Sequence, residues 1–259
     1  MEFYKYQGTG NDFIIIDNRD PKFDRSNNAL VAKLCDRRFG IGADGLMLLQ
    51  NKKGFDFEMV YYNSDGNESS MCGNGGRCIV EFARTLGLTK EETHFYASDG
   101  AHEAIVKPNF ISLKMKDVDD VESTDDFYFL NTGSPHYVTF VKNLADFNVV
   151  EEGKKIRYNS RFKAQGTNVN FVEKQGDELF VRTYERGVED ETYSCGTGVT
   201  AAALVAAIKN SSTATGYCDI KTLGGKLKVK FNKQDNNTFT DVWLEGPATF
   251  VYKGTIEME

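Results

Sequence analysis

Two cysteines of this chain stand in the same local context. Cys72 lies in MCGNGGRC, residues 71–78, and Cys195 lies in SCGTG, residues 194–198. In each motif the cysteine is followed by Gly-x-Gly and then by a segment whose apolar spacing predicts a helix. Glycines at a helix entrance let a ligand approach the backbone, and the unpaired N–H groups of the first turn bind an anion. The same positive helix end favours the thiolate of an adjacent cysteine, which makes it a better base or nucleophile.

Two thiols beside two anion-binding helix starts suit one reaction in particular. If both helix N-termini met at a single substrate carboxylate, their thiols would flank it from opposite sides. Inverting an amino acid's α-carbon needs a base on one face to remove the proton and an acid on the other face to return one. Preorganised N–H donors and helix dipoles in a water-free pocket can stabilise the carbanion without a cofactor. The residues therefore favour racemisation by a thiolate and a thiol.

A long internal repeat predicts the elements that position these motifs. An alternating strand, a polar loop, Cys-Gly-x-Gly and a helical segment occur in residues 54–88 and again from Gly176 onward. Each copy is preceded by a strand that enters a Gly-bearing turn before an apolar strand, in residues 4–17 and 128–141, and each is followed by further strands. The two cysteines thus occupy equivalent positions in the repeat.

The repeat also predicts how the chain divides. The simplest explanation is two similar α/β halves joined near the acidic stretch DVDDVESTDD, residues 117–126, which we interpret as a solvated linker. We therefore expect an N-terminal half, 1–117, with the first reactive cysteine and a C-terminal half, 118–259, with the second.

The other three cysteines have structural explanations. Cys78 corresponds to Ala201 in the repeat and has apolar neighbours at helical spacing, so we expect it to pack in a helix core. Cys35 lies in a similar apolar stripe, and Cys218 falls in a predicted strand. Five scattered cysteines do not suggest a disulfide framework. No metal site is expected, because zinc sites usually use tighter cysteine pairs with histidine nearby.

Composition excludes several classes of partner. The 259 residues are 40% hydrophobic, which is typical of a folded globular protein, and the net charge of -7 disfavours nucleic acid or an anionic membrane as the main partner. The N-terminal residues show no charged segment followed by an apolar core, and no apolar run approaches the ~20 residues of a membrane-spanning helix. We therefore expect a cytoplasmic protein whose partner is a small-molecule substrate.

Longer motifs resemble those of the diaminopimelate epimerases, which are pyridoxal-phosphate-independent amino-acid racemases. These motifs are GTGNDF near the start, YYNSDGNESSMCGNGGRC, GSPH, TNVNF, YERGVEDETYSCGTG and GPATFVY near the end, and the match runs essentially end to end. The resemblance implies an α/β fold of the α+β type: two pseudo-symmetric domains, each a curved mixed β-sheet around a central helix, with the active site in the interdomain cleft. It also implies interconversion of L,L- and meso-diaminopimelate, in lysine and peptidoglycan biosynthesis, without cofactor or metal. Whether the last strand returns to the N-terminal half, and whether the chain forms a homodimer, stays open.

The resemblance assigns roles to individual residues. It makes Cys72 and Cys195 the catalytic pair, with His136 and Glu185 near the thiols and able to tune their ionisation. The helix starts would hold the carboxylate at the reacting centre, and the remaining residues would hold the rest of the substrate. The residues implied to bind substrate are Asn11, Asn63, Gly73, Asn74, Asn168, Glu185, Arg186, Gly196 and Thr197.

The sequence departs from the family pattern at two positions. Some members have glutamine where this chain has Gly45, and many have Gly-Asn-Pro-His where this chain has serine, Ser134, in place of the asparagine. The side-chain contacts that the family makes at these two positions therefore do not carry over directly.

Two other classes of function stay open on the sequence. The stretch GTGVTA, residues 196–201, fits the Gly-x-Gly-x-x-Ala of a dinucleotide-binding turn, but that fingerprint needs a strand directly before the glycines and here a polar loop intervenes. The nearer alternative is a related racemase. Histidine-type enzymes are the closer relatives, whereas proline-type members typically read Cys-Gly-His-Gly in the first motif and lack Glu-Arg-Gly before the second.

Overall fold

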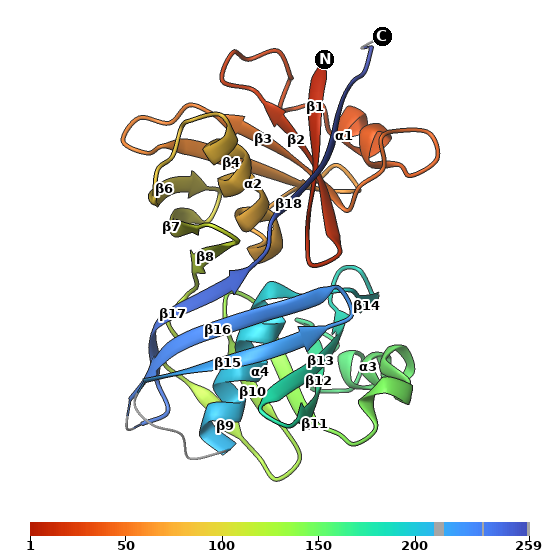
Figure 1. Ribbon diagram of the computed structural model, residues 1–259. Helices are drawn as coiled ribbons and strands as arrows, with labels where there is room; N and C mark the ends of the chain where they lie inside the picture. The colour runs from red at the N-terminus through yellow and green to blue at the C-terminus, as the bar shows by residue number, and fades with distance from the viewer. Residues whose placement is uncertain (210–214, 235, 258–259) are drawn as a thin grey trace. The chain divides into compact units, whose positions relative to one another are not determined.

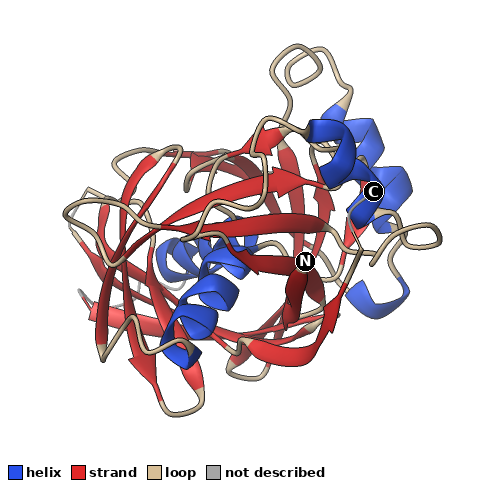
Figure 2. Cartoon of the chain, turned by 90° about the horizontal axis from the view of Figure 1, so that it is seen from above, coloured by secondary structure: helices blue, strands red, loops and turns tan. Residues whose placement is uncertain are grey.

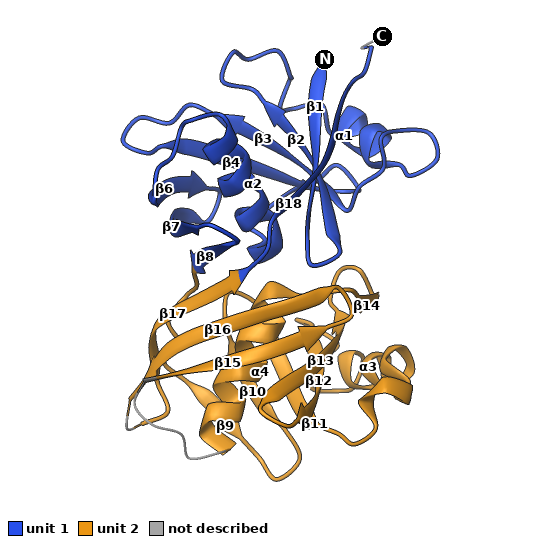
Figure 3. Ribbon diagram, viewed as in Figure 1, with its two compact units in different colours: residues 1–113, 246–259 blue, residues 114–245 orange. Residues whose placement is uncertain are grey.

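The computed structural model describes residues 1–209, 215–234 and 236–257. The chain divides into two compact units, shown in different colours in Figure 3: unit 1 is Met1–Leu113 with Gly246–Glu259, and unit 2 is Lys114–Glu245. The last strand belongs to unit 1 together with the N-terminal strands. The repeat in the sequence places the junction at residue 117, and the domain limits 1–117 and 118–259 stay a prediction.

Unit 1 is built on a mixed β-sheet. Its strands are β1 (Glu2–Gly8), β2 (Asn11–Asp17), β3 (Gly45–Gln50), β4 (Phe57–Asn63), β5 (Glu68–Ser69), β6 (Glu92–Ala97), β7 (Gly100–Lys107), β8 (Phe110–Lys114) and β18 (Thr249–Thr255). β1 pairs antiparallel with β2 and β18, β2 runs parallel to β3, and β3 is antiparallel to β4. β4 pairs with the short β5 and runs parallel to β6, which is followed by antiparallel β7 and β8.

Unit 2 repeats this order of pairings. Its strands are β9 (Val121–Ser123), β10 (Tyr128–Asn131), β11 (Pro135–Phe140), β12 (Asn168–Gln175), β13 (Glu178–Glu185), β14 (Asp190–Thr192), β15 (Thr215–Thr222), β16 (Gly225–Lys233) and β17 (Phe239–Gly246). β10 and β9 are antiparallel, as are β10 and β11, and β11 runs parallel to β12. β13 pairs antiparallel with β12 and β14 and parallel with β15, and antiparallel β16 and β17 follow. The predicted repeat and the predicted mixed sheets are therefore confirmed.

The parallel pairs explain where the helices lie in the sequence, because parallel neighbours need a crossover connection. In unit 1, α1 (Asn28–Cys35) connects β2 to β3, and α2 (Gly73–Thr85) follows β4 and precedes β6 (Figure 1). In unit 2, α3 (Val149–Arg157) and α4 (Gly196–Lys209) occupy the equivalent places, and a 3-10 turn, η1 (Leu144–Asp146), precedes α3. Cys72 immediately precedes α2 and Cys195 immediately precedes α4, so each lies before the second crossover helix of its unit.

These second helices form the centre of each unit. α2 contacts β1, β2, β3, β4, β7 and β18, and α4 contacts β10, β11, β12, β13, β15 and β16. In the view of Figure 2, some helical turns lie among the strands and others lie outside them. Residues 198–207 of α4 are all buried, as expected for a helix that is apolar on every side. A central helix enclosed in this way is held by packing, so its N-terminus is a rigid platform for a reactive group.

The structural interpretation of the remaining cysteines is confirmed. Cys78 on α2 and Cys35 at the end of α1 are buried, and burial raises the pKa of each thiol to about 12. Cys218 lies on β15, as expected, with its pKa also raised to about 12 by burial. None of the five cysteines, all of which the structure describes, is in a disulfide.

Within the described ranges, no helix has the length and apolar character needed to cross a membrane.

α3, the first crossover helix of unit 2, packs closely on β13. Gly153 of α3 faces Tyr184 of β13 so closely that a Cβ atom on Gly153 would lie 2.6 Å from the Tyr184 Cγ. Alanine normally stabilises a helix interior relative to glycine by about 1 kcal/mol. Here the clash dominates, because the strand backbone beneath Tyr184 cannot easily move.

We therefore expect Gly153→Ala to lower the free energy of unfolding by about 1–3 kcal/mol, the usual effect of overpacking. Urea denaturation measures this change, and Lys154→Ala is the matched control because Lys154 is the exposed neighbour on the same helix. A Gly153→Ala protein as stable as the parent would contradict the tight packing of α3 on β13.

Candidate active site

Cys72 occupies the N-cap position of α2, in extended backbone just before the first helical turn. Its carbonyl accepts a hydrogen bond from Gly76 N at 2.6 Å, and its half-buried thiol lies 3.6 Å from Asn11 Oδ1. Asn11 opens β2, directly after the turn from β1. The first N–H groups of a helix have no intrahelical acceptor, so this end of α2 can bind a carboxylate beside the thiol.

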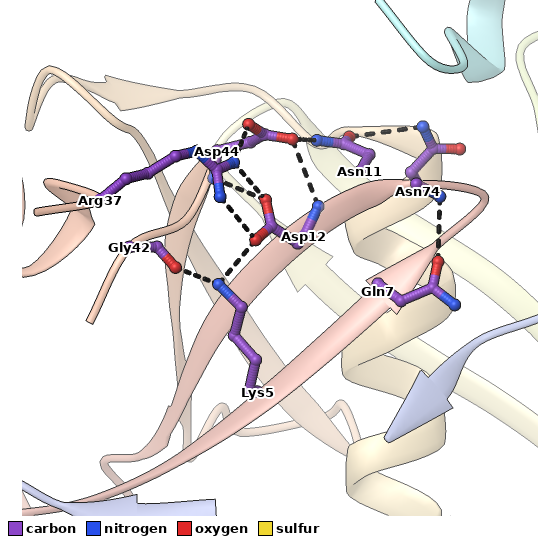
Figure 4. Close-up of polar contacts among 9 residues, drawn as sticks. Lys5, Gln7, Asn11, Asp12, Arg37, Gly42, Asp44 and Asn74 are labelled. Atoms are coloured by element: carbon purple, nitrogen blue, oxygen red, sulfur yellow. Dashed lines mark hydrogen bonds and ion pairs between the residues drawn. The ribbon is translucent and has the colours of Figure 1, made fainter. Parts of the chain in front are cut away.

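A cluster of charged side chains fixes the direction of the Asn11 amide (Figure 4). Asn11 Nδ2 donates to Asp44 Oδ2 at 2.7 Å, and because a carboxylate only accepts, the amide oxygen must face the other way. That oxygen accepts from Asn74 Nδ2 at 3.3 Å. Arg37 in turn binds both Asp44 and Asp12, at 2.7 Å each. Asn11 is therefore oriented by charge, with its oxygen toward Cys72 and Asn74.

The Asp12 carboxylate anchors the other side of this cluster. Lys5 Nζ lies 2.7 Å from Asp12 Oδ2 and also donates to the carbonyl of Gly42. Burial alone would raise the pKa of Asp12, but hydrogen bonds from Arg37 and Lys5 outweigh it and lower the pKa to about 2. Asp12 therefore stays ionised over the physiological pH range and keeps Arg37 in place.

Arg77 lies one turn into α2 and is 0% exposed. Its guanidinium donates to Gly73 O at 3.3 Å, Asn74 Oδ1 at 3.0 Å, Thr9 Oγ1 at 3.3 Å and Pro247 O at 3.4 Å. These acceptors are all neutral, and within the described ranges no carboxylate forms an ion pair with Arg77. A buried, hydrogen-bonded positive charge adds to the helix dipole, so it favours an anion at this end of α2.

Asn63 ends β4 with an exposed side chain, and its backbone N donates to Asn67 O at 3.0 Å. In the part of the chain that the structure describes, no hydrogen bond joins the Asn63 side chain to Cys72. Gly45, one of the departures from the family pattern, pairs with Asn63 across β3 and β4. A Cβ on Gly45 would lie 2.6 Å from Tyr61 Cε2, so the Tyr61 ring fills the space that a side chain at this position would need.

Cys195 immediately precedes α4 and is 6% exposed. Its carbonyl accepts from Val199 N at 2.9 Å, and its Sγ lies 3.5 Å from Thr197 Oγ1. A side chain at Gly198 would clash with Asn170 Oδ1 and would lie 3.4 Å from the Cys195 sulfur. The glycine therefore permits the close approach of the thiol, the first turn of α4 and β12.

His136, on β11, is fully buried and is linked to Cys195 by two hydroxyl groups. Its Nε2 lies 3.0 Å from Ser134 Oγ, which lies 3.3 Å from Thr197 Oγ1. Thr197 Oγ1 then contacts the Cys195 sulfur. On the other side of the ring, Nδ1 lies 3.1 Å from Asn170 Nδ2. The serine that departs from the family pattern thus lies in the middle of a chain from histidine to thiol.

The His136 ring is neutral at physiological pH. Burial, together with the nearby positive charge of Arg186, lowers the pKa of His136 to about 3, and the hydrogen bond with Asn170 offsets this only in part. A neutral imidazole has one N–H donor and one nitrogen acceptor, so it can transmit hydrogen-bond direction from Asn170 to Ser134.

Asn168, Glu185 and Arg186 lie at the ends of the neighbouring strands β12 and β13. Asn168 Oδ1 accepts from Arg186 N at 2.8 Å, and its Nδ2 donates to Ser134 Oγ at 3.0 Å. Glu185 Oε2 accepts from Thr192 Oγ1 at 2.9 Å, while the Arg186 side chain is exposed. Unit 2 therefore gathers Asn168, the backbone of Arg186 and the hydroxyl chain to Cys195.

Several residues of the two clusters are absent from the sequence prediction. Asn170 is the clearest case, and its signal is the alternation of β12, which puts it on the same face as Asn168. Asp44, Arg37 and Arg77 carry no comparable signal, because isolated charged residues are usually solvated.

Within residues 1–209, 215–234 and 236–257, no three His, Cys, Asp or Glu side chains form a group that could hold a metal ion.

Known proteins resemble this chain over its full length. The family model described as Diaminopimelate epimerase matches residues 3–118 and 128–251. A diaminopimelate epimerase of Flavobacterium psychrophilum is 56% identical over 258 residues, covering 99% of this chain and 100% of the relative. A diaminopimelate epimerase of Chlorobaculum tepidum is 42% identical and covers 97% of this chain and 99% of its own.

Solved structures share the fold at much lower identity. A PhzF-family phenazine biosynthesis protein of Bacillus anthracis superposes with a TM-score of 0.79 at 14% identity, covering 100% of this chain and 99% of its own. A hydroxyproline epimerase from Agrobacterium vitis gives a TM-score of 0.70 at 14% identity, covering 98% and 91%. The structural likeness supports the α+β fold class, and the sequence matches decide the family. This chain belongs to the diaminopimelate epimerase family.

Proposed function

We propose that this protein interconverts L,L-diaminopimelate and meso-diaminopimelate by a two-base mechanism. The observation that carries the proposal is the family match across both halves of the repeat, which includes both Cys-Gly-x-Gly motifs. Each motif supplies a thiol at the start of a central helix. An enzyme of this kind is an epimerase that works without pyridoxal phosphate.

In the proposed mechanism Cys72 and Cys195 act on opposite faces of one α-carbon. One cysteine, as thiolate, takes the α-proton and becomes a thiol, leaving a carbanion on the substrate. The other, as thiol, gives its proton to the opposite face and becomes a thiolate. The configuration of that carbon is inverted, and the enzyme ends with its charge and its proton exchanged between the two sulfurs.

The carboxylate beside the reacting carbon would be held by the starts of the central helices. Gly73 and Asn74 begin α2, and Gly196 and Thr197 begin α4. Their N–H groups and helix dipoles would stabilise the charge that develops when the α-proton leaves. The buried guanidinium of Arg77 would add to this stabilisation.

The second amino-acid group of diaminopimelate would be held by polar residues at strand ends. We assign this role to Asn11, Asn63, Asn168, Glu185 and Arg186. A guanidinium can hold a carboxylate with two parallel hydrogen bonds, so Arg186 is the residue best suited to the distal carboxylate. Its exposed side chain leaves the guanidinium accessible to a ligand.

The proposal extends to cellular setting and assembly. We place the enzyme in the cytoplasm, where lysine and peptidoglycan precursors would be its substrates, and we infer that it forms a homodimer. β18 supports the dimer, because Phe250, Val251 and Tyr252 are 49%, 51% and 43% exposed and a second copy could cover them. Sedimentation velocity measures the oligomeric state directly.

Incubation with L,L-diaminopimelate in deuterium oxide tests the reaction. We expect the meso isomer to form with one deuterium at the inverted carbon, because the returning proton comes from a thiol that exchanges with solvent. Chiral chromatography with mass spectrometry measures both quantities. Histidine and proline serve as control substrates: their rapid racemisation, or failure to convert diaminopimelate, would point to a different racemase of this fold.

Replacing either Cys72 or Cys195 by alanine should lower epimerisation by at least ~100-fold, because general acid or base catalysis is lost on one face. Turnover of L,L-diaminopimelate by each purified variant measures the loss. Cys218→Ala is the matched control and should keep most of the activity, since Cys218 lies on β15 outside both clusters. Epimerisation that survives in a well-folded Cys195→Ala protein would falsify the two-thiol mechanism.

Arg186→Lys should lower kcat/KM for diaminopimelate by at least ~10-fold, equivalent to ~1.4 kcal/mol, because an ammonium group lacks the planar two-donor fork. Stability should change little, because the backbone N–H of Arg186 still binds Asn168. The opposing interpretation is a surface arginine: its Nη1 donates to Gln165 O at 3.1 Å. Arg161→Lys, at an exposed ion pair with Glu122, is the control. Unchanged efficiency in Arg186→Lys, or rapid racemisation of lysine, would remove the specificity assignment.

A further inference from the structure

We propose that Arg157 is a positioning residue for Arg186. It holds the carboxylate of Glu189 against α3, and it thereby keeps that carboxylate from pairing with the Arg186 guanidinium, to which a carboxylate of the substrate would bind. The inference rests on the proposed function in treating Arg186 as the residue that binds the distal carboxylate. It adds the reason why an acidic residue in the same loop does not compete with the substrate.

Arg186 and Glu189 are the first and last residues of the loop that joins β13 to β14. The ladder between these strands ends at the pair of Glu185 with Asp190, so the loop is formed by residues 186–189. Glu189 N donates to Glu185 O at 2.8 Å, which closes the turn. Opposite charges so near to one another in an exposed loop attract, so the sequence alone favours an ion pair between Arg186 and Glu189.

The structure turns the Glu189 side chain toward α3 instead. Its Oε2 accepts from Tyr158 Oη at 2.9 Å and from Tyr184 Oη at 3.1 Å. Its Oε1 accepts from the backbone N of Gly187 at 3.1 Å and lies 3.3 Å from Arg157 Nε. Arg157 is the last residue of α3, and Tyr158 is the C-cap. Both oxygens of the carboxylate are therefore engaged by the end of this helix and by the loop itself.

The Glu189 carboxylate is ionised in these surroundings. Burial alone would raise its pKa, but the hydrogen bonds from Gly187, Tyr158 and Tyr184 and the charge of Arg157 outweigh burial and lower it. Tyr184 keeps the proton that it donates, because burial and the bond to Glu189 raise the pKa of Tyr184 to about 12. The side chains of Arg157 and Glu189 are 14% and 31% exposed, so salt screens this ion pair less than one on the open surface.

The backbone of Glu189 is held in a strained conformation. Its φ is 58°, in the left-handed region that residues other than glycine rarely adopt. Glycine would fit the same backbone without strain, but it has no carboxylate to bind α3. Strain of this kind persists only where the surroundings fix the conformation, and here the contacts with Arg157 and the two tyrosines fix it.

Two arginine side chains meet at Gly166, in the segment that leads to β12. A Cβ atom on Gly166 would lie 2.5 Å from Arg186 Cδ and 2.9 Å from Arg157 Cζ, so both side chains pack on this position. The Arg186 guanidinium donates to a neutral acceptor, Gln165 O. The carboxylate of Glu189 binds Arg157, so it neutralises that arginine and leaves the charge of Arg186 to attract a ligand.

Two acidic residues that follow the loop have other partners. Glu191 binds Arg182, with 2.6 Å between Glu191 Oε1 and Arg182 Nε. Asp190 Oδ1 accepts from the backbone N of Glu191 at 2.8 Å. Glu189 is therefore the acid of this hairpin whose placement depends on Arg157, and Asp190 offers a matched control for the loss of one negative charge nearby.

Arginine labelling of ligand-free, full-length protein tests the placement of Glu189. Phenylglyoxal reacts with the uncharged guanidine, so an ion pair with a carboxylate slows modification of that arginine. Peptide mass spectrometry measures the rate at Arg186, and Arg161, which pairs with Glu122, is the internal control. We expect Arg157→Gln to slow modification of Arg186 at least ~3-fold, because the released carboxylate then pairs with Arg186. Adding Glu189→Gln to Arg157→Gln should restore the parent rate.

Kinetics of the same variants test the consequence for substrate binding. Arg157→Gln should raise KM for diaminopimelate at least ~3-fold and change kcat by less than ~1.5-fold, because the competing carboxylate opposes binding and not the chemical step. Glu189→Gln alone should leave KM within ~1.5-fold of the parent value, and the variant with both changes should return to that range. Arg157→Lys, which keeps the charge, and Asp190→Asn should each leave KM near the parent value.

Tyr158→Phe gives a second test that changes no charge. It removes one donor from Glu189 Oε2, so it should slow labelling of Arg186 and raise KM, each by less than Arg157→Gln does. Tyr158 is exposed, so the variant should fold as the parent does, and thermal unfolding checks this.

Unchanged labelling of Arg186 in both Arg157→Gln and Tyr158→Phe would overturn the inference. So would strictly additive effects, with KM falling in Glu189→Gln as far as it rises in Arg157→Gln, because addition would show that only the net charge near Arg186 matters. The labelling assay contains no substrate, so its result stands whichever amino acid the enzyme epimerises. Failure of the parent protein to convert diaminopimelate would instead overturn the proposed function.

Discussion

Burial of a helix inside a curved sheet is the constraint on which each unit depends. When strands cover the sides of a helix, only its ends stay accessible to a ligand. At the N-terminal end, the first N–H groups have no acceptor within the helix. In both central helices a side chain in the second turn also forms a hydrogen bond to the carbonyl of the first helical residue. Four residues into the helix, Arg77 donates to Gly73 O at 3.3 Å, and its counterpart Thr200 donates to Gly196 O at 2.9 Å. The cysteine directly before each helix is thus held against a rigid first turn.

The shared scaffold carries two different sets of polar side chains. In unit 1 the set is charged: Arg37, Asp12 and Asp44 orient Asn11, and Arg77 is buried beneath it. In unit 2 the chain of hydrogen bonds from His136 through Ser134 and Thr197 to Cys195 consists of an uncharged imidazole and hydroxyls, and the charged residues Glu185 and Arg186 lie at the end of β13. Buried polar groups are costly unless every donor meets an acceptor, so such networks adopt one hydrogen-bond arrangement. The two units therefore share an arrangement of strands and helices and differ in the polar network beside the cysteine at the start of the central helix.

The two departures from the family pattern have local physical explanations. Gly45 lies under the ring of Tyr61, which leaves no room for a longer side chain. Ser134 takes part in three hydrogen bonds, to His136, Asn168 and Thr197, so the residue in the asparagine position is still a full member of the network. Both positions show a change of side chain absorbed by its immediate neighbours, without a change in the strand pairings around it.

The sequence by itself determined the repeat, the mixed sheets, the two central helices and the equivalence of Cys72 and Cys195. These features depend on local periodicity and on motifs at fixed spacing, which survive in a linear string. It also separated Cys35 and Cys78 as core residues, because an apolar stripe identifies a buried face. Only the tertiary structure decided which side chains form hydrogen bonds with the residues of those motifs. Asn170, Asp44 and Arg77 are ordinary polar residues in the sequence, and they matter because folding brings them within hydrogen-bond distance of particular atoms. The direction of the hydrogen bonds also depends on tertiary structure. Whether the Asn11 amide turns its oxygen or its nitrogen toward Cys72 is decided by the carboxylate of Asp44, which lies 33 residues away in the chain, and no local pattern encodes that contact.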